Sequence, residues 1–126
     1  MVPGEHLLHL QRGRQLLEED LASEAEKEFK KAIALDPTNA EAHGGLARVL
    51  ELTQDKAGAR SEARKALNLK PSPDVYLVLA RVDLAENKTA AASEDVDRAL
   101  ALDPGNASAV ALKREIALAA GSKRQP

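Results

Sequence analysis

Hydrophobic residues recur along this chain at spacings of three and four, the period of a helix with one buried face. No stretch shows the strict alternation of apolar and polar residues that is typical of a half-buried strand. Short polar or proline-containing breaks divide the pattern into segments. The pattern therefore predicts seven helices, over residues 5–19, 24–35, 39–52, 56–69, 73–86, 90–102 and 107–120.

Helix start signals stand at several of these breaks. Thr38 and Glu41 have the spacing of a capping box, in which the threonine opens a helix and the glutamate bonds back to it. Ser72, Pro73 and Asp74 combine a capping side chain, a proline in the first turn and an acid at the helix N-terminus. Connections this short predict that successive helices are antiparallel neighbours.

A short sequence occurs three times in closely similar form, and each copy ends in a proline. The copies are residues 32–37 (AIALDP), 66–71 (ALNLKP) and 99–104 (ALALDP), so the prolines follow one another at spacings of 34 and 33. Such a period is typical of arrays of helical pairs. The sequence therefore predicts repeated units of about 6–39, 40–72 and 73–106, then a capping helix at 107–120, within a single domain over 1–120 and with a basic tail at 121–126.

Composition supports stacked helices over a sheet. Hydrophobic residues make up 44% of the chain and aromatic residues only 2%, so the helices must pack through small side chains. The net charge of −2, with 30% charged residues, predicts a mixed surface without general attraction to nucleic acid or anionic membrane. The chain has no cysteine, which excludes disulfides and thiol catalysis but fits either redox compartment.

No apolar run approaches the roughly 18 residues of a membrane span, and charges interrupt the first fifteen residues too early for a signal-sequence core. We therefore expect a soluble protein with no membrane span, cytoplasmic by default.

These residues resemble the tetratricopeptide repeat family, whose pattern places small and large residues at fixed points of a helix-turn-helix unit. The resemblance rests on residues at matching positions of the three units: Gly13, Leu16, Ala25, Phe29, Ala32 and Pro37; Leu46, Ala47, Leu50, Ala59, Ala63, Ala66 and Pro71; Tyr76, Leu79, Ala80, Ala92, Val96, Ala99 and Pro104. His9, Arg12, His43 and Asp83 depart from the family pattern. The resemblance implies an all-α, right-handed α-solenoid of three repeats plus a capping helix, and a protein that binds other proteins.

No catalytic, metal or cofactor site is predicted. His6 and His9 stand close together on one helix, but His9 and His43 show the repeat spacing of 34, so equivalent packing positions explain them without a metal. Gly44-Gly45 lacks the preceding strand and the spacing of a phosphate-binding loop. We expect no cofactor and no enzyme activity.

The resemblance implies that the first helices of the pairs line a concave groove. Helical spacing places ten candidate peptide-binding residues on that face: Leu10, Arg14, Leu17, Gly44, Gly45, Arg48, Leu77, Val78, Arg81 and Leu84. The three arginines show the same spacings of 34 and 33 as the prolines, so stacked repeats would form an arginine ladder. We hypothesise that the groove binds a segment with aliphatic anchors and an acidic group. In the alternative interpretation each arginine pairs with a carboxylate such as Glu18, Glu51 or Glu86 and closes the seam between repeats.

Family members that clamp chaperone tails use lysine and asparagine at set groove positions. The matching positions here hold Leu10, Gly45, Asp74 and Val78, so the sequence disfavours binding of such tails.

Two other functions remain open at this point. Val110, Leu112, Ile116 and Leu118 make the last helix apolar around much of its circumference, which would suit a homo-oligomer formed through this helix. The chain could also be a regulatory segment of a larger enzyme.

Overall fold

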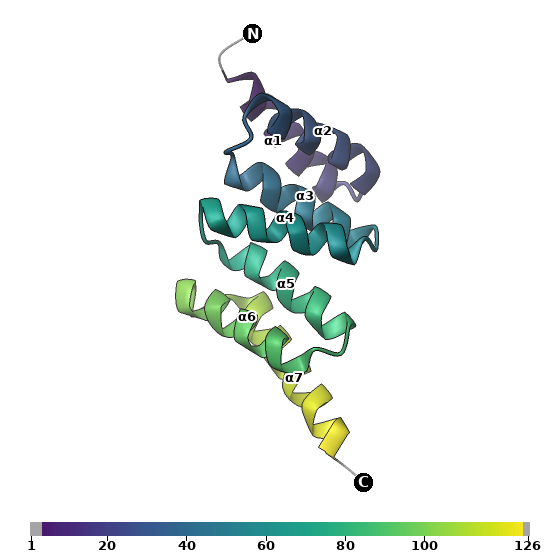
Figure 1. Ribbon diagram of the computed structural model, residues 1–126, viewed down its shortest axis with the longest axis vertical. Coiled ribbons are helices and arrows are strands. Elements are labelled where there is room, and N and C mark those ends of the chain that lie inside the picture. Colours follow the sequence, from purple (N-terminus) through teal and green to yellow (C-terminus); the bar gives the residue numbers. More distant parts are fainter. Residues whose placement is uncertain (1–3, 125–126) are drawn as a thin grey trace. The chain divides into compact units, whose positions relative to one another are not determined.

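The computed structural model describes residues 4–124, and within them every regular element is an α-helix (Figure 1). This confirms the all-α fold. The helices are α1 (Glu5–Glu18), α2 (Ala22–Leu35), α3 (Ala40–Leu52), α4 (Lys56–Leu69), α5 (Pro73–Ala85), α6 (Thr89–Leu102) and α7 (Ala107–Arg124).

Six helix boundaries differ from those predicted, and those at the ends of α1 and α5 and at the start of α3 differ by one residue. Helix α2 begins at Ala22 and α6 at Thr89, because the carbonyls of Leu21 and Lys88 accept from backbone N–H groups one turn later without a side-chain cap. Helix α7 continues to Arg124 and not only to residue 120. The predicted basic tail thus begins inside α7, and residues 125–126 lie outside the described residues.

The predicted cap at Thr38 is wrong by one residue. Asn39 caps α3, its Oδ1 accepting from the Ala42 N–H at 2.9 Å. Thr38 instead donates its hydroxyl to Asp36 Oδ1 at 2.7 Å, because the aspartate side chain turns back over the loop. Ser72 makes no side-chain cap bond, so α5 begins with its proline at the first position.

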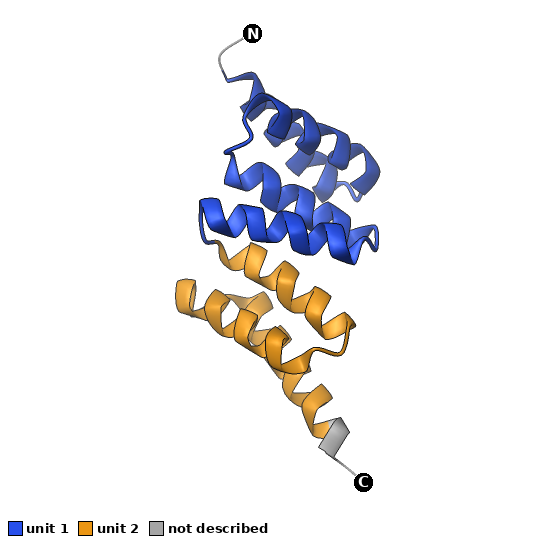
Figure 2. Cartoon of the chain, viewed as in Figure 1, with its two compact units in different colours: residues 1–71 blue, residues 72–126 orange. Residues whose placement is uncertain are grey.

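The chain forms two compact units, residues 1–71 and 72–126 (Figure 2). In unit 1, α1 packs on α2, α2 on α3, and α3 on α4, while α1 also contacts α3. Its core is built around Phe29, which is fully buried among alanines and leucines from α1, α2 and α3. The fully buried Ala25 and Ala32 flank this ring along α2, which permits the close helix approach expected from the composition.

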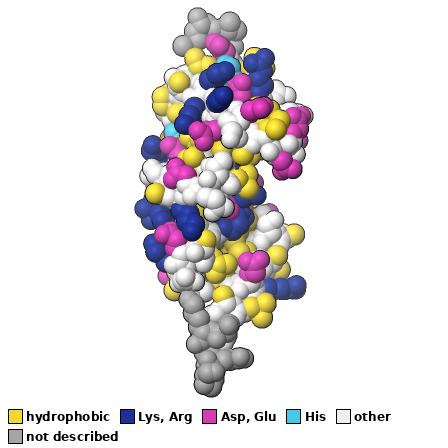
Figure 3. Space-filling view, turned by 90° about the vertical axis from the view of Figure 1, so that its right-hand side faces the viewer, with side chains coloured by type: hydrophobic (Ala, Val, Ile, Leu, Met, Phe, Trp, Pro, Cys, Tyr) yellow, Lys and Arg dark blue, Asp and Glu magenta, His cyan; other side chains and the backbone are white. Residues whose placement is uncertain are grey.

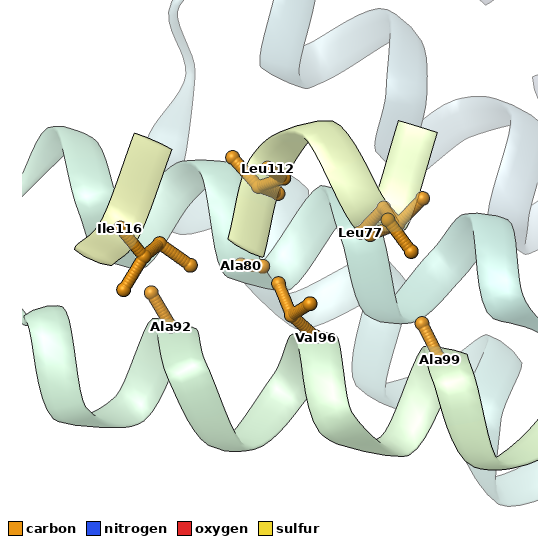
Figure 4. Packing of buried hydrophobic residues seen from close by; sticks show 8 residues of the cluster. Leu77, Ala80, Ala92, Val96, Ala99, Leu112 and Ile116 are labelled. Carbon is orange, nitrogen blue, oxygen red and sulfur yellow. The ribbon is translucent and has the colours of Figure 1, made fainter. Parts of the chain in front are cut away.

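Unit 2 contains α5, α6 and α7, and α7 packs on both of the others. Figure 4 shows its core, in which Ala92, Val96 and Ala99 of α6 face Leu77 and Ala80 of α5 and, from α7, Leu112 and Ile116. The residues of α6 that match the family pattern, Ala92, Val96 and Ala99, are therefore fully buried. Helix α7 buries one face only, since Val110 and Leu118 remain 39% and 74% exposed.

The turn between the two helices of each pair contains one residue with a left-handed backbone. Asp20, Gln54 and Asn87 have φ values of 60°, 71° and 62°. These positions repeat at spacings of 34 and 33, so the same turn is built three times from three different side chains. Asparagine and aspartate tolerate this conformation better than glutamine does.

The surface mixes the two signs of charge. On the face displayed in Figure 3, basic and acidic side chains are interspersed, in keeping with a net charge of −2. Leu7 and Leu8, although part of the helical pattern of α1, are 53% and 46% exposed. No helix in the described part of the chain has the length and apolar character needed to cross a membrane.

Candidate functional site

Three of the ten predicted groove residues lie in the interior. Leu10, Leu77 and Val78 are only 4%, 2% and 2% exposed. Leu10 belongs to the Phe29 cluster of unit 1, and Leu77 to the α5–α6–α7 core of unit 2. The expectation that these three side chains anchor a ligand is therefore wrong, because burial within the chain already occupies their apolar surface.

Gly45 has a packing role that the sequence interpretation missed. A Cβ added there would lie 2.4 Å from Phe29 Cε1, and a Cβ at Gly13 would lie 2.8 Å from the same atom. The ring thus fits between two helices because both positions lack a side chain. Gly45 needs no approaching ligand to explain it, whereas its neighbour Gly44 is half-buried on α3.

The two arginines of unit 1 that the sequence places in the groove are ion-paired. Arg14 on α1 pairs with Glu41 on α3, with side chains 55% and 53% exposed. Arg48 Nη1 donates to Glu51 Oε1 at 2.9 Å, and its side chain is 42% exposed. Arg48 therefore pairs with Glu51, the partner named in the alternative interpretation, but within α3 and not across a seam. Arg14 instead pairs with Glu41 and so joins the first helices of two repeats.

The remaining predicted residues are partly accessible. Leu17 is half-buried against the core of unit 1, and Leu84 against that of unit 2. Arg81 is half-buried on α5. The accessible candidates are therefore Arg14, Leu17, Gly44 and Arg48 in unit 1, and Arg81 and Leu84 in unit 2.

Two of the three histidines of unit 1, His9 and His43, each join the two helices of one pair. His9 Nδ1 lies 2.6 Å from Glu28 Oε2, and His43 Nδ1 lies 2.6 Å from Glu62 Oε2. The hydrogen bond from His9 holds the pKa of Glu28 below its usual value. The sequence pattern identifies the equivalent histidines but missed their partners, although the two glutamates repeat at the same spacing of 34.

In unit 2, the corresponding contact between the two helices is made by two acidic residues and not by a histidine and a glutamate. Asp83 on α5 and Asp95 on α6 are each 7% exposed, and their side chains are hydrogen-bonded to each other. Burial and the neighbouring Asp83 raise the pKa of Asp95 to about 7. No group of three or more histidine, cysteine or acidic residues suited to a metal ion occurs within the described residues.

The sequence model of the tetratricopeptide repeat family matches residues 16–82 of this chain. The match covers just over half of the chain and spans parts of all three repeats, so the chain belongs to the tetratricopeptide repeat family. A search of curated proteins gave no match.

Solved structures show the same fold. The first tetratricopeptide repeat domain of human RPAP3 is 25% identical, covers 97% of each chain and superposes with a TM-score of 0.88. The first such domain of Spaghetti (RPAP3), bound to the HSP90 peptide SRMEEVD, is 24% identical over 96% of this chain and 97% of that one, with a TM-score of 0.86.

The second tetratricopeptide repeat domain of human RPAP3, in complex with the HSP70 peptide SGPTIEEVD, is 23% identical over 91% of this chain and 98% of that chain, with a TM-score of 0.80. This fold is a known protein-interaction module, and neither the family match nor these structures indicates a catalytic family.

Proposed function

We propose that this chain is a non-catalytic interaction module that binds a peptide or partner segment along the exposed faces of its first helices. The single observation that carries the proposal is the Arg14–Glu41 pair, which leaves polar groups of α1 and α3 exposed side by side. The fold neighbours support the same role, since two of them were solved with bound peptides.

The ion pairs on these helices leave their arginines available to a ligand. Arg14 and Arg48 are 55% and 42% exposed. The Arg14–Glu41 pair is open to water on both sides, and such a pair contributes at most about 1 kcal/mol. A ligand carboxylate can therefore replace Glu41 at small cost and form a bidentate pair with the Arg14 guanidinium group, while the exposed part of Arg48 offers further N–H donors. We expect an acidic side chain or terminal carboxylate in the bound segment.

Partly buried leucines supply the apolar part of the proposed surface. Leu17 in unit 1 and Leu84 in unit 2 present some apolar area beside the core. In unit 1, Leu17 would accept an aliphatic side chain of the ligand, with Gly44 leaving room for its backbone. Leu84 offers a comparable contact in unit 2.

Chaperone tails are not the partners that we propose. The positions that clamp such tails in other family members hold the buried Leu10 and Val78, the ring-packed Gly45, and the exposed acid Asp74. An acidic tail would meet one negative charge and no lysine there. The peptide SRMEEVD is therefore a suitable negative control.

The test is a selection of peptides from a random display library against the full chain, followed by calorimetric titration. Arg48→Ala should weaken binding of the selected peptide by about tenfold to a hundredfold, because a charge-assisted hydrogen bond contributes roughly 1.5–3 kcal/mol. Arg64→Ala removes the same charge from the second helix of the same repeat and should leave affinity unchanged. Equal effects of the two variants, or no selectable peptide, would refute the proposal.

A second candidate function is self-association through α7, which the exposure of Leu118 favours. Sedimentation equilibrium over a hundredfold concentration range distinguishes it. A mass that rises with concentration and returns to that of one chain in Leu118→Glu would support this candidate, whereas a constant monomer mass would remove it.

A further inference from the structure

The second helix of each repeat carries a carboxylate at the same position, but the third one meets a different neighbour. Glu28, Glu62 and Asp95 repeat at spacings of 34 and 33. In unit 1 each glutamate meets a histidine of the first helix at 2.6 Å. In unit 2 the residue that corresponds to these histidines is Tyr76. Asp95 therefore has no histidine at the position where Glu28 and Glu62 meet theirs.

Asp95 instead meets a second acid. Asp83 occupies the position that Leu16 and Leu50 hold in the earlier repeats, and its side chain is hydrogen-bonded to that of Asp95. Two carboxyl groups can share a direct hydrogen bond only when one of them carries a proton, since an ionised carboxylate only accepts. Both residues are buried, so ionising the pair places two like charges together away from water.

The other charges around Asp95 compensate this repulsion only in part. Arg98 on α6 donates to Asp95 Oδ1 at 3.2 Å, but its own side chain is 55% exposed. Helix α7 brings Lys113 toward α6, where it bonds Asp97 at 3.1 Å and not Asp95. The charged groups acting on Asp95 are thus Asp83 from α5 and Arg98 from α6.

We propose that Asp83 and Asp95 form a shared-proton switch that tightens the packing of α6 on α5 when one proton is bound and loosens it when both carboxyls are ionised. The device belongs to unit 2 alone. Its stabilising proton is bound at acid pH and lost as the solution becomes mildly alkaline.

The direction of the pH effect follows from the two states. Asp95 has a pKa raised to about 7 in the folded chain, against an ordinary value of 3.8. Between these values the folded chain binds more protons than the unfolded chain, so its stability falls as pH rises. The folding equilibrium constant should fall by up to about tenfold per pH unit across this interval and level off above it.

Tyr76 makes unit 2 separately observable. It is the only tyrosine in a chain without tryptophan, and it packs against the core of unit 2. Urea unfolding of the full chain, followed by tyrosine fluorescence, should show a midpoint that falls between about pH 5 and about pH 8. Asp95→Asn should abolish most of this fall, because an amide can donate to Asp83 without ionising. The matched control, Asp97→Asn on the same helix, should keep it.

Carbon-detected NMR titration of the side-chain carboxyls provides a direct second readout. Asp95 should titrate with a midpoint near 7, and Asp83→Asn should lower that midpoint, while burial keeps it above the ordinary value of 3.8. A midpoint near 4 in the unmodified chain, or a midpoint unmoved by Asp83→Asn, would overturn the proposal. So would a Tyr76-monitored stability that is equally pH-dependent in Asp95→Asn and Asp97→Asn.

Discussion

His43 joins α3 to α4 and to the preceding loop at once, with Nδ1 2.6 Å from Glu62 Oε2 and Nε2 2.8 Å from the Pro37 carbonyl oxygen. Each ring nitrogen of His43 therefore lies within hydrogen-bond distance of an oxygen from a different segment. At a position where the family pattern has a large aromatic side chain, this chain has the buried His43, which links three segments through polar contacts.

His43→Ala should therefore lower the free energy of unfolding by about 2 kcal/mol, because it removes two hydrogen bonds and leaves Glu62 without its ring partner. Urea denaturation followed by circular dichroism measures this loss. His6→Ala is the matched control, since His6 lies 3.6 Å from Asp36 with both side chains partly exposed. Equal losses in the two variants would contradict this role of His43.

Gly45→Ala should destabilise the chain by about 1–3 kcal/mol, the usual range for overpacking a core. The new Cβ would lie 2.4 Å from a Phe29 ring atom, so the ring or α3 must move. Gly121→Ala is the control, because its Cβ meets nothing within 4 Å and alanine favours a helix.

The same clash can be tested by removing its second partner. Phe29→Leu combined with Gly45→Ala should cost less than the sum of the two single changes, since the smaller side chain makes room for the Cβ. If the two losses of stability were additive in the same denaturation experiment, the Phe29 ring would not be the reason why position 45 lacks a side chain.

Because of Glu28, we predict that the stability of unit 1 depends on pH in the opposite direction to that of unit 2. The pKa of Glu28 is lowered in the folded chain by its hydrogen bond from His9. Its contribution to stability is therefore complete above its ordinary value of 4.5 and is lost as pH falls below that value. The protection factors of the α2 amides, which correct for the intrinsic pH dependence of exchange, should fall on acidification, and less so in Glu28→Gln. Protection factors in α2 that stay constant on acidification would contradict this.

Gln54→Gly should raise the free energy of unfolding by about 0.5–1 kcal/mol. Gln54 has a φ of 71°, a left-handed conformation that costs a residue with a side chain about 1–2 kcal/mol and glycine very little. Gln11→Gly, at an exposed position inside α1, should instead lower stability by about 1 kcal/mol. Thermal unfolding of both variants checks the opposite signs.

The repeat period made most of the fold predictable from the sequence. The prolines and alanines that recur with this period place all seven helices close to their positions in the structure. The boundaries at Ala22 and Thr89 were missed because backbone carbonyls, and not capping side chains, open those helices.

The candidate site was less predictable, for a physical reason. Helical spacing tells which residues share a face, but it does not tell which part of that face a neighbouring helix covers. Leu10 and Leu77 were therefore assigned to the groove although the core covers them. Partners such as Glu28 and Asp83 depend on contacts between helices, which a single helix pattern does not contain.

The central claim is that a ligand binds the exposed faces of the first helices, and backbone-amide NMR mapping with a selected peptide tests it most directly. In unit 1 we predict shifts in α1 and α3 around Arg14, Gly44 and Arg48, with the amides of α2 and α4 largely unchanged. Shifts confined to α2 and α4, or no shifts at saturating peptide, would contradict the account.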